Sequence, residues 1–336
     1  MPIAMTSDFV ARQPIGRLID ALSPCIVDIG ARGGADEDAL AIAWASEMVG
    51  FEPDAAEARR LAQAGDTRWR RFTLLPYAVG GHTGLQTLYL PESPEAASLL
   101  QHNSAMIERF GRANLHVVQS TLVVETRTLD ELRLRGDISR VDYLKVDVEG
   151  AELDILAAGT SVLKDCVALK VECSFLPQRN QQPLIWDVAR FLLGIGFEVV
   201  ELSDIHRWRR RNLPAHPYRI DFRMPYSRGQ VAQCDVVMLK GAEHVRDEDE
   251  ALRLIVFAAV FGYFDYAISV LRAITGLPKR AQADYGFDLE AELTNWSAIT
   301  GRREVSKAIA SGIRGMVPLF RALAGRLPFP RGGIPY

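Results

Sequence analysis

Residues 141–153 read VDYLKVDVEGAEL, a short apolar run that passes through two carboxylates directly into a helical pattern. The run 141–146 is typical of a buried strand in a parallel sheet. Asp147 and Glu149 then stand on alternate positions, so both side chains are predicted to face the same way. Because strands of a doubly wound sheet bind ligands at their carboxyl ends, this pattern predicts a functional site at Asp147 and Glu149.

A structural role is the alternative for the charged residues of this segment. An acid at the N-terminus of the predicted helix 152–158 is favourable by roughly 0.3–1 kcal/mol, which would explain Glu149 alone but not two acids together. Lys145 alternates with Asp147 along the strand. We expect Lys145 to pair with an acid in the layer below and not to act in catalysis.

The order of predicted elements indicates a parallel α/β sheet, because strands and helices alternate as far as Lys240. Beyond Lys240 the pattern becomes helical, and we divide the chain into residues 1–242 and a helical C-terminal extension, residues 243–336. Asp54 is a plausible N-cap and Gly196 a plausible C-cap. Strands are predicted at 25–29, 47–52, 72–79, 85–90, 116–126, 141–146, 167–171, 197–202 and 236–240, and helices at 8–22, 54–64, 94–110, 182–193, 251–274 and 288–300.

The bulk composition excludes several classes of protein. The chain has 336 residues and a formal charge of -3, so it has no general basic field for nucleic acid. Its four cysteines form no Cys-x-x-Cys pair, which indicates reduced thiols and no zinc site. The apolar segment 254–264 is too short to span a bilayer, and the first ten residues do not resemble a signal peptide. We therefore expect a cytoplasmic protein.

A glycine-rich turn follows the first predicted strand, in Asp28-Ile29-Gly30-Ala31-Arg32-Gly33-Gly34. Glycines there permit a tight turn and close approach of a ligand, but the spacing departs from the Gly-x-Gly-x-x-Gly of nicotinamide-binding proteins. Glu52 ends the second strand, where a carboxylate can accept hydrogen bonds from both hydroxyls of a ribose. The alternative is that Glu52 is an ordinary loop acid.

Together these segments resemble the FkbM-type methyltransferases, at 28–34, 51–53, 128–132 and 145–152. The resemblance implies a seven-stranded, mostly parallel, Rossmann-like sheet and S-adenosylmethionine as the methyl donor. Arg32 stands where the family commonly has Asn. The predicted cofactor-binding residues are Asp28, Gly30, Ala31, Gly34, Glu52, Val79 and Asp147.

The family implies methylation of an oxygen, and a hydroxyl nucleophile needs a base or a metal to take charge of its proton. The predicted catalytic residues are Asp147, Glu149 and Glu172, the last of which ends the next strand. Either Glu149 or Glu172 acts as the base, or Asp147 and Glu172 bridge a divalent metal. The metal-free mechanism is favoured, because no further acid stands beside Glu172.

The acceptor is predicted to be a small molecule or, by preference, a sugar or glycan hydroxyl. A basic stretch in the connection between the last two strands suits a polar, phosphorylated acceptor, with Trp208, Tyr218 and Tyr226 available for stacking. A solvated loop face is the alternative. The predicted substrate-binding residues are His206, Trp208, Arg209 and Arg210.

The C-terminal segment 302–336 interleaves basic and apolar residues. Such a segment can lie on an anionic membrane surface, here the inner face of the membrane, and docking onto protein is the alternative. Two rival functions stay open for the whole chain. One is a noncatalytic scaffold with a methyltransferase-like domain, and the other is a nicotinamide dehydrogenase.

Overall fold

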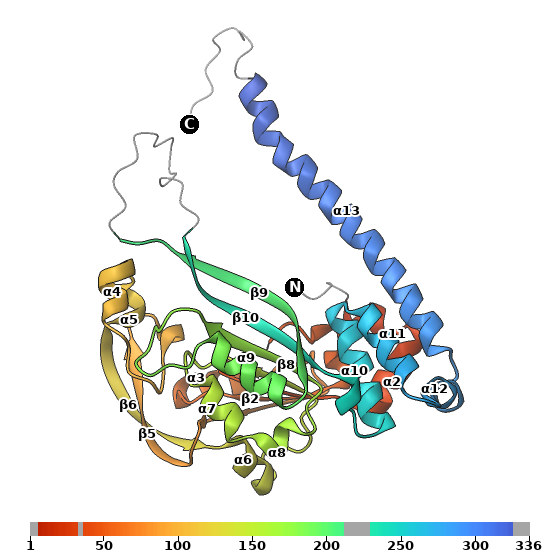
Figure 1. Cartoon of the computed structure of the whole chain (residues 1–336), viewed down its shortest axis with the longest axis horizontal. Coiled ribbons are helices and arrows are strands. Elements are labelled where there is room, and N and C mark those ends of the chain that lie inside the picture. Colours follow the sequence, from red (N-terminus) through yellow and green to blue (C-terminus); the bar gives the residue numbers. More distant parts are fainter. Residues whose placement is uncertain (1–5, 33–35, 212–228, 325–336) are drawn as a thin grey trace.

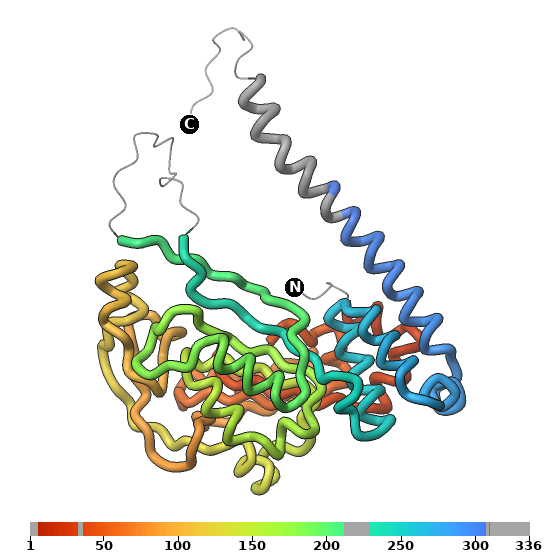
Figure 2. Tube along the Cα trace, viewed as in Figure 1, coloured from red at the N-terminus to blue at the C-terminus, as the bar shows by residue number. Residues whose placement is uncertain are grey.

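The computed structural model describes residues 6–32, 36–211 and 229–324, and its centre is a seven-stranded sheet (Figures 1 and 2). The strand order is β3-β2-β1-β7-β8-β10-β9. The first five of these strands pair in parallel, and β10 runs antiparallel to both β8 and β9. The predicted doubly wound α/β fold is confirmed. The bounds are β1 (Cys25–Ile29), β2 (Glu47–Phe51), β3 (Arg71–Leu75), β7 (Tyr143–Val146), β8 (Ala168–Ser174), β9 (Phe197–Trp208) and β10 (Gln230–Lys240).

The strand order reverses between β1 and β7. The chain adds β2 and β3 on one side of β1, and then returns to place β7 on the other side. Ligands of open α/β sheets bind at such a switch point, outside the carboxyl ends of the strands. The fold therefore directs attention to the residues that follow β1 and β7.

Alternate residues of the strands enter two separate cores, one on each face of the sheet. Val27 and Leu144 pack on one face against α6 (Leu129–Arg135), α7 (Glu152–Ala157), α8 (Thr160–Leu163) and α9 (Ile185–Gly194). Ile26 and Tyr143 pack on the other face against α2 (Pro14–Leu22), α10 (Glu248–Phe261) and α11 (Phe264–Ala273). Every residue of β1 is buried, because both faces are covered.

The C-terminal helices are part of the second of these cores. Residues 250–261 of α10 are all buried, and the Tyr143 ring lies against those of Phe257 and Phe261, at 5.7 and 5.2 Å between centroids. Arg253 Nε lies 2.9 Å from Asp142 Oδ1. The division after residue 242 stays a prediction, but α10 covers the sheet directly.

Several of the predicted helices have different bounds in the structure. The segment 8–22 is broken by Pro14 into α1 (Ser7–Ala11) and α2, and Gly262, with φ 93°, separates α10 from α11. After α12 (Leu277–Tyr285), α13 extends from Leu289 to Ala324 and projects away from the sheet (Figure 1). Within the described ranges, no helix is long and apolar enough to cross a membrane.

A second, three-stranded sheet has the order β4-β6-β5. Its strands are β4 (Ala78–Val79), β5 (Gly84–Pro91) and β6 (Val118–Arg127). The predicted strand 72–79 is therefore wrong as one element. Pro76 has no N–H to continue a ladder, and the chain passes there from β3 in the large sheet to β4 in the small one.

The predicted helix 94–110 is also wrong as one element. Only η2 (Pro94–Ala96) and α4 (Ala105–Phe110) are helical, because the chain between them makes bridges elsewhere: Ser98 pairs with Tyr89 and His102 pairs with Arg179. The remaining elements are η1 (Leu40–Ala45), α3 (Ala55–Ala64), α5 (Ala113–His116) and η3 (Ala242–His244).

Several local predictions are confirmed. Asp54 caps α3 through Oδ1, which accepts from the N–H groups of Ala56 and Glu57. Gly196 follows α9 with φ 94°. The four cysteines are free and buried.

Candidate functional site

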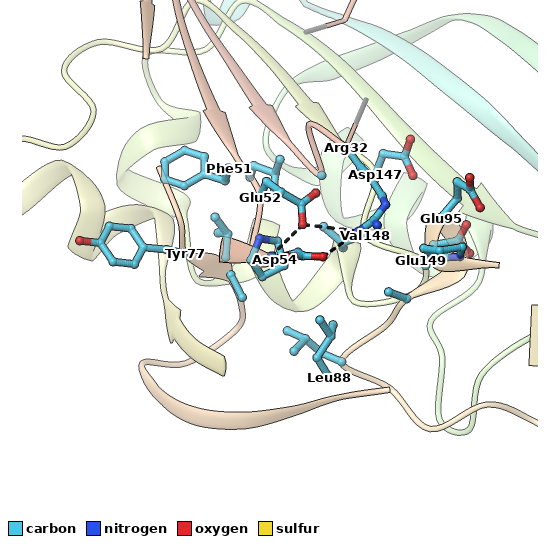
Figure 3. Close-up of a pocket in the computed structure, with 18 of the residues that line it drawn as sticks. Arg32, Phe51, Glu52, Asp54, Tyr77, Leu88, Glu95, Asp147, Val148 and Glu149 are labelled. Carbon is cyan, nitrogen blue, oxygen red and sulfur yellow. Dashed lines mark hydrogen bonds and ion pairs between the residues drawn. The ribbon is translucent and has the colours of Figure 1, made fainter. Parts of the chain in front are cut away.

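A cavity of about 300 Å³ lies over the carboxyl ends of the central strands (Figure 3). The large sheet contributes Gly30 after β1, Glu52 after β2, Asp147 after β7 and Glu172 near the end of β8. Apolar residues of the small sheet line it as well. They are Ala78, Val79, Leu88, Leu90 and Leu122.

The floor of this cavity depends on Gly30. Its φ is 92°, and a Cβ built there would lie 1.9 Å from the carbonyl oxygen of Asp147. The Asp147 N–H donates to the carbonyl oxygen of Ile29 at 3.0 Å, so β1 and β7 stay in contact past their last paired residues. Only glycine allows this approach without displacing the backbone.

Asp28 lies below the cavity and does not line it. The side chain is fully buried, and its Oδ2 accepts from the Asp36 N–H at 2.9 Å. Lys145 Nζ lies 3.4 Å from Asp28 Oδ1 and 3.2 Å from Asp147 Oδ2. Burial raises the pKa of Asp28 to about 6, and the Lys145 ammonium opposes that rise. Lys145 thus pairs with the acid in the layer below, as predicted.

Glu52 is held at the end of β2 by the backbone that follows it. Glu52 Oε1 accepts from the Asp54 N–H at 2.8 Å, and the residue is only 3% exposed. Burial raises its pKa. Arg32 Nη1 lies 3.8 Å from Glu52 Oε1 and 3.9 Å from Asp54 Oδ2, and all three side chains face the cavity (Figure 3).

Glu149 lines the cavity although it lies outside strand β7, so the alternation of strand residues does not determine its direction. β7 ends at Val146, and Glu149 has a left-handed backbone with φ 61°. The predicted strand alternation of Asp147 and Glu149 is therefore wrong, although both residues line the cavity. Glu152, and not Glu149, accepts from the N–H groups of Val148 and Gly150, at 3.2 and 2.8 Å.

Two of the carboxylates that line this cavity, Glu149 and Glu172, have strongly raised pKa values. Burial raises the pKa of Glu149 to about 7, although the Arg179 guanidinium, 2.9 Å from Glu149 Oε2, lowers it. Burial, and then the charge of Glu149, raises the pKa of Glu172 well above its ordinary value. Gln233 Nε2 donates to Glu172 Oε1. Such perturbed acids are frequent at functional sites.

A second cavity, of about 280 Å³, adjoins the first, and Glu95 and Glu149 line both. Its other lining residues come from η2, from α5 and the residue before it, from the segment after β8, and from the β9–β10 ribbon. They include Arg112, Gln178, Arg179, His206, Arg207, Trp208 and Gln233.

The basic stretch that was predicted to bind the substrate as a loop is therefore partly a strand. β9 continues to Trp208, so His206 and Trp208 lie on the ribbon and line the second cavity. Trp208 is only 4% exposed and packs edge-on against Phe110 and His116, so it is a core residue and not an open stacking surface. Arg209 and Arg210 follow the strand and line neither cavity. Tyr218 and Tyr226 lie outside the described residues.

Another predicted cofactor residue, Ala31, does not line the cavity. Ala31 is buried, and its N–H donates to the Phe51 carbonyl oxygen at 3.1 Å, so its part is to hold the turn. Gly34 lies outside the described residues. Over the part of the chain that is described, no group of three or more His, Cys, Asp or Glu residues is placed to hold a metal ion.

The sequence reasoning missed Arg179, Tyr77 and Arg112. Arg179 follows β8 by a few residues, so the strand-end rule that found Glu172 points to the same region. Tyr77 lines the first cavity, with the Arg127 guanidinium 4.9 Å from its ring centroid. No local signal marks Arg112, which the tertiary fold brings to the second cavity.

Comparison with known families settles the class of this chain. The Methyltransferase FkbM domain matches residues 28–207, more than half of the chain. The protein belongs to this family. It is therefore an α/β methyltransferase, and S-adenosylmethionine is the methyl donor of this family.

One named protein and two solved structures are similar to this chain. The 2-O-methyltransferase NoeI of Sinorhizobium fredii (strain NBRC 101917 / NGR234) is 27% identical over 164 residues, which is 47% of this chain and 66% of NoeI, just under two thirds. A Streptococcus pneumoniae crystal structure described as a candidate tRNA (m1A22) methyltransferase has 11% identity and a TM-score of 0.31, covering 83% of this chain and 96% of its own. The N-terminal domain of EvdMO1, crystallised with SAH, has 12% identity and a TM-score of 0.30, covering 68% and 81%.

Proposed function

We propose that this protein transfers the methyl group of S-adenosylmethionine to a hydroxyl of a sugar or glycan. The family supports methyl transfer, and the name of NoeI, a 2-O-methyltransferase, supports an oxygen acceptor. The observation that carries the proposal is that two cavities meet at Glu149, one over the strand ends and one beside the β9–β10 ribbon.

The residues of the first cavity fit the donor. Glu52 offers a buried carboxylate to the ribose hydroxyls, and Tyr77 and Val79 offer an apolar wall to the base. Gly30 allows the backbone of Asp147 to approach the end of β1, which shapes the floor under the donor. Asp147 and Glu149 present negative charge, which suits a sulfonium. When bound, the donor supplies an electrophilic methyl carbon, and a neutral thioether is left behind.

Glu149 is the proposed general base. It lines both cavities, whereas Glu172 lines only the first. With a pKa of about 7, Glu149 is substantially ionised at neutral pH and also basic enough to accept the hydroxyl proton as the new C–O bond forms. Arg179 orients the carboxylate through the 2.9 Å ion pair. Asp147 is proposed to face the sulfonium, and Glu172 to support the polar wall through Gln233.

The metal-bridged mechanism is kept as a distinct alternative. In it, Asp147 and Glu172 would hold a divalent cation, for which carboxylate oxygens are suitable ligands. Removal of divalent ions with EDTA distinguishes the mechanisms: base catalysis predicts unchanged turnover, and the metal mechanism predicts loss of turnover that Mg²⁺ or Mn²⁺ restores.

The donor site is tested by titrating S-adenosylhomocysteine into the wild-type protein and into Glu52→Gln in a calorimeter. Truncating a charge-assisted hydrogen bond costs about 1.5–3 kcal/mol, so affinity should fall by at least about 10-fold. Glu108→Gln is the matched control, because Glu108 is exposed on α4 and lines neither cavity. Equal affinity in all three proteins contradicts the proposed ribose contact.

The acceptor class is tested with labelled donor and a panel of neutral and charged glycans and sugars. Label transferred to a sugar oxygen supports the proposal. Binding of the donor without transfer to any acceptor in a whole-cell extract would favour the scaffold function, and binding of NADH in its place would favour a dehydrogenase.

A further inference from the structure

The second cavity has an excess of positive charge that the site described so far does not use. Arg112 and Arg207 line it, and neither side chain is ion-paired with any carboxylate of the described residues. The side chains of exposed arginines usually extend into solvent, whereas these two, from separate elements, line the same cavity. Arg112 stands at the start of α5, and Arg207 lies on β9.

The Arg112 guanidinium is held in place before any ligand binds. Its Cζ lies 5.5 Å from the centroid of the Trp208 ring. Trp208 is fixed in turn by edge-on contacts with Phe110 and His116, each at 5.6 Å between ring centroids. A cation–π contact with a buried, immobile ring restricts the guanidinium and lowers the entropy cost of binding an anion.

The acids of this cavity do not cancel these charges. Glu149 is compensated by Arg179, which is almost fully buried and also donates to the Ala96 carbonyl oxygen at 3.0 Å. Glu95 accepts from the neutral Ser93 hydroxyl, at 3.1 Å, and keeps its charge, so three guanidinium groups face two carboxylates in the second cavity. His206 also lines the cavity and offers a polar ring.

Charge is therefore separated along the two joined cavities. Asp147, which is proposed to face the sulfonium, lines only the first cavity, and Glu149 stands between the two cavities. Unpaired guanidinium groups gather on the side of the second. A guanidinium offers a planar fork of donors that matches the oxygens of carboxylate and phosphate.

We propose that the second cavity recognises an anionic group, a carboxylate or a phosphate, on the acceptor through Arg112 and Arg207. This inference rests on the proposed function and specifies its substrate class: an acidic sugar, either a uronic acid or a sugar phosphate. The cavity is about 280 Å³, close to the lower limit of roughly 300 Å³ for ligand pockets, which suits one charged sugar unit.

The experiment compares matched probes in the full-length protein saturated with S-adenosylhomocysteine. Methyl β-D-glucuronide carries a carboxylate, glucose 1-phosphate carries a phosphate, and methyl β-D-glucoside is neutral. Calorimetric affinities for at least one anionic probe should exceed that for the glucoside about 10-fold or more, since a hydrogen bond to a charged group contributes roughly 1.5–3 kcal/mol. The two anionic arms separate the uronic acid from the sugar phosphate.

The variants Arg112→Gln and Arg207→Gln should each weaken the preferred anionic probe about 10-fold and leave the glucoside unchanged. Arg190→Gln is the matched control, because Arg190 is exposed on α9 and lines neither cavity. All three variants should bind S-adenosylhomocysteine like the wild type, which also shows that they are folded.

Two results would overturn the inference while leaving the donor site intact. One is equal affinity for the charged and neutral probes, and the other is an equal effect of the Arg→Gln changes on both. If S-adenosylhomocysteine itself does not bind, the proposed function fails. In that case the same probes are titrated into the protein alone, where loss of the anion preference in Arg112→Gln and Arg207→Gln still supports the anion site.

Discussion

Replacement of Gly30 by alanine is expected to damage both the fold and the donor site, because this position makes two separate demands on the backbone. Its φ of 92° disfavours a side chain, at about 1–2 kcal/mol for a left-handed L-residue. The new Cβ would also lie 1.9 Å from the Asp147 carbonyl oxygen, whereas real Cβ contacts are not shorter than 3.0 Å. The ends of β1 and β7 must then separate by about 1.1 Å.

Overpacking of this kind costs about 1–3 kcal/mol, so the total loss of unfolding free energy in Gly30→Ala should be about 2–5 kcal/mol. The catalytic effect should be larger than the loss of stability suggests. A displacement of about 1 Å at a reacting group can lower the rate by about 10²-fold. Here the backbone that would be displaced is that of Asp147, which lines the donor cavity.

Gly136→Ala provides the matched control. Gly136 also has a left-handed backbone, with φ 79°, but a Cβ built there meets nothing within 4 Å. The Gly136→Ala variant should lose only the unfolding free energy due to the left-handed backbone, about 1–2 kcal/mol. Its affinity for S-adenosylhomocysteine should stay unchanged. Urea unfolding followed by tryptophan fluorescence, with calorimetry of the donor product, measures both quantities. If the two variants lose equal stability and Gly30→Ala binds normally, the contact between the strand ends does not shape the site.

Three further predictions concern the acids and the buried tryptophan. Glu149→Gln should lower kcat by about 10²–10⁴-fold and remove the rise of kcat/KM around pH 7, and a pH profile that keeps this rise would exclude Glu149 as the base. Burial raises the pKa of Glu152 from 4.5 to about 7, so the folded protein holds this proton more tightly than the unfolded chain. The unfolding free energy should therefore fall by up to about 3 kcal/mol as the pH rises between those values, and urea titrations of Glu152→Gln should show a weaker pH dependence than the wild type. Trp208→Ala should cost about 3–5 kcal/mol in urea unfolding, because the ring is a core residue, and a loss of acceptor affinity at unchanged stability would contradict this.

The central sheet was predictable because its strands are buried on both faces. A strand such as β1 reads as a continuous apolar run, and the acid or glycine that follows it marks the carboxyl end. This rule identified the positions of Gly30, Glu52, Asp147 and Glu172 without any tertiary information. The cap of α3 was equally local, since the hydrogen bonds that Asp54 accepts come from the first turn of the same helix.

The acceptor side was less predictable because it is built from residues distant in sequence. β9 continues well beyond the predicted end at Leu202, but there the ribbon leaves the core and is largely exposed, so its residues read as a polar loop. Arg179, Arg112 and Trp208 meet only after the segment following β8, helix α5 and this ribbon have come together. No sequence period connects them.

The position of α10 has a consequence for how the protein is made. On the ribosome, α2 and β1 are synthesised early, yet the apolar surface they share with Phe257 and Leu252 has no cover until the last helices are translated. This apolar surface of the nascent chain is therefore exposed to solvent for most of translation, and we expect it to promote aggregation during that time. A recombinant fragment that stops at residue 242 should accumulate in inclusion bodies, whereas co-expression of residues 243–324 as a separate polypeptide should recover soluble protein.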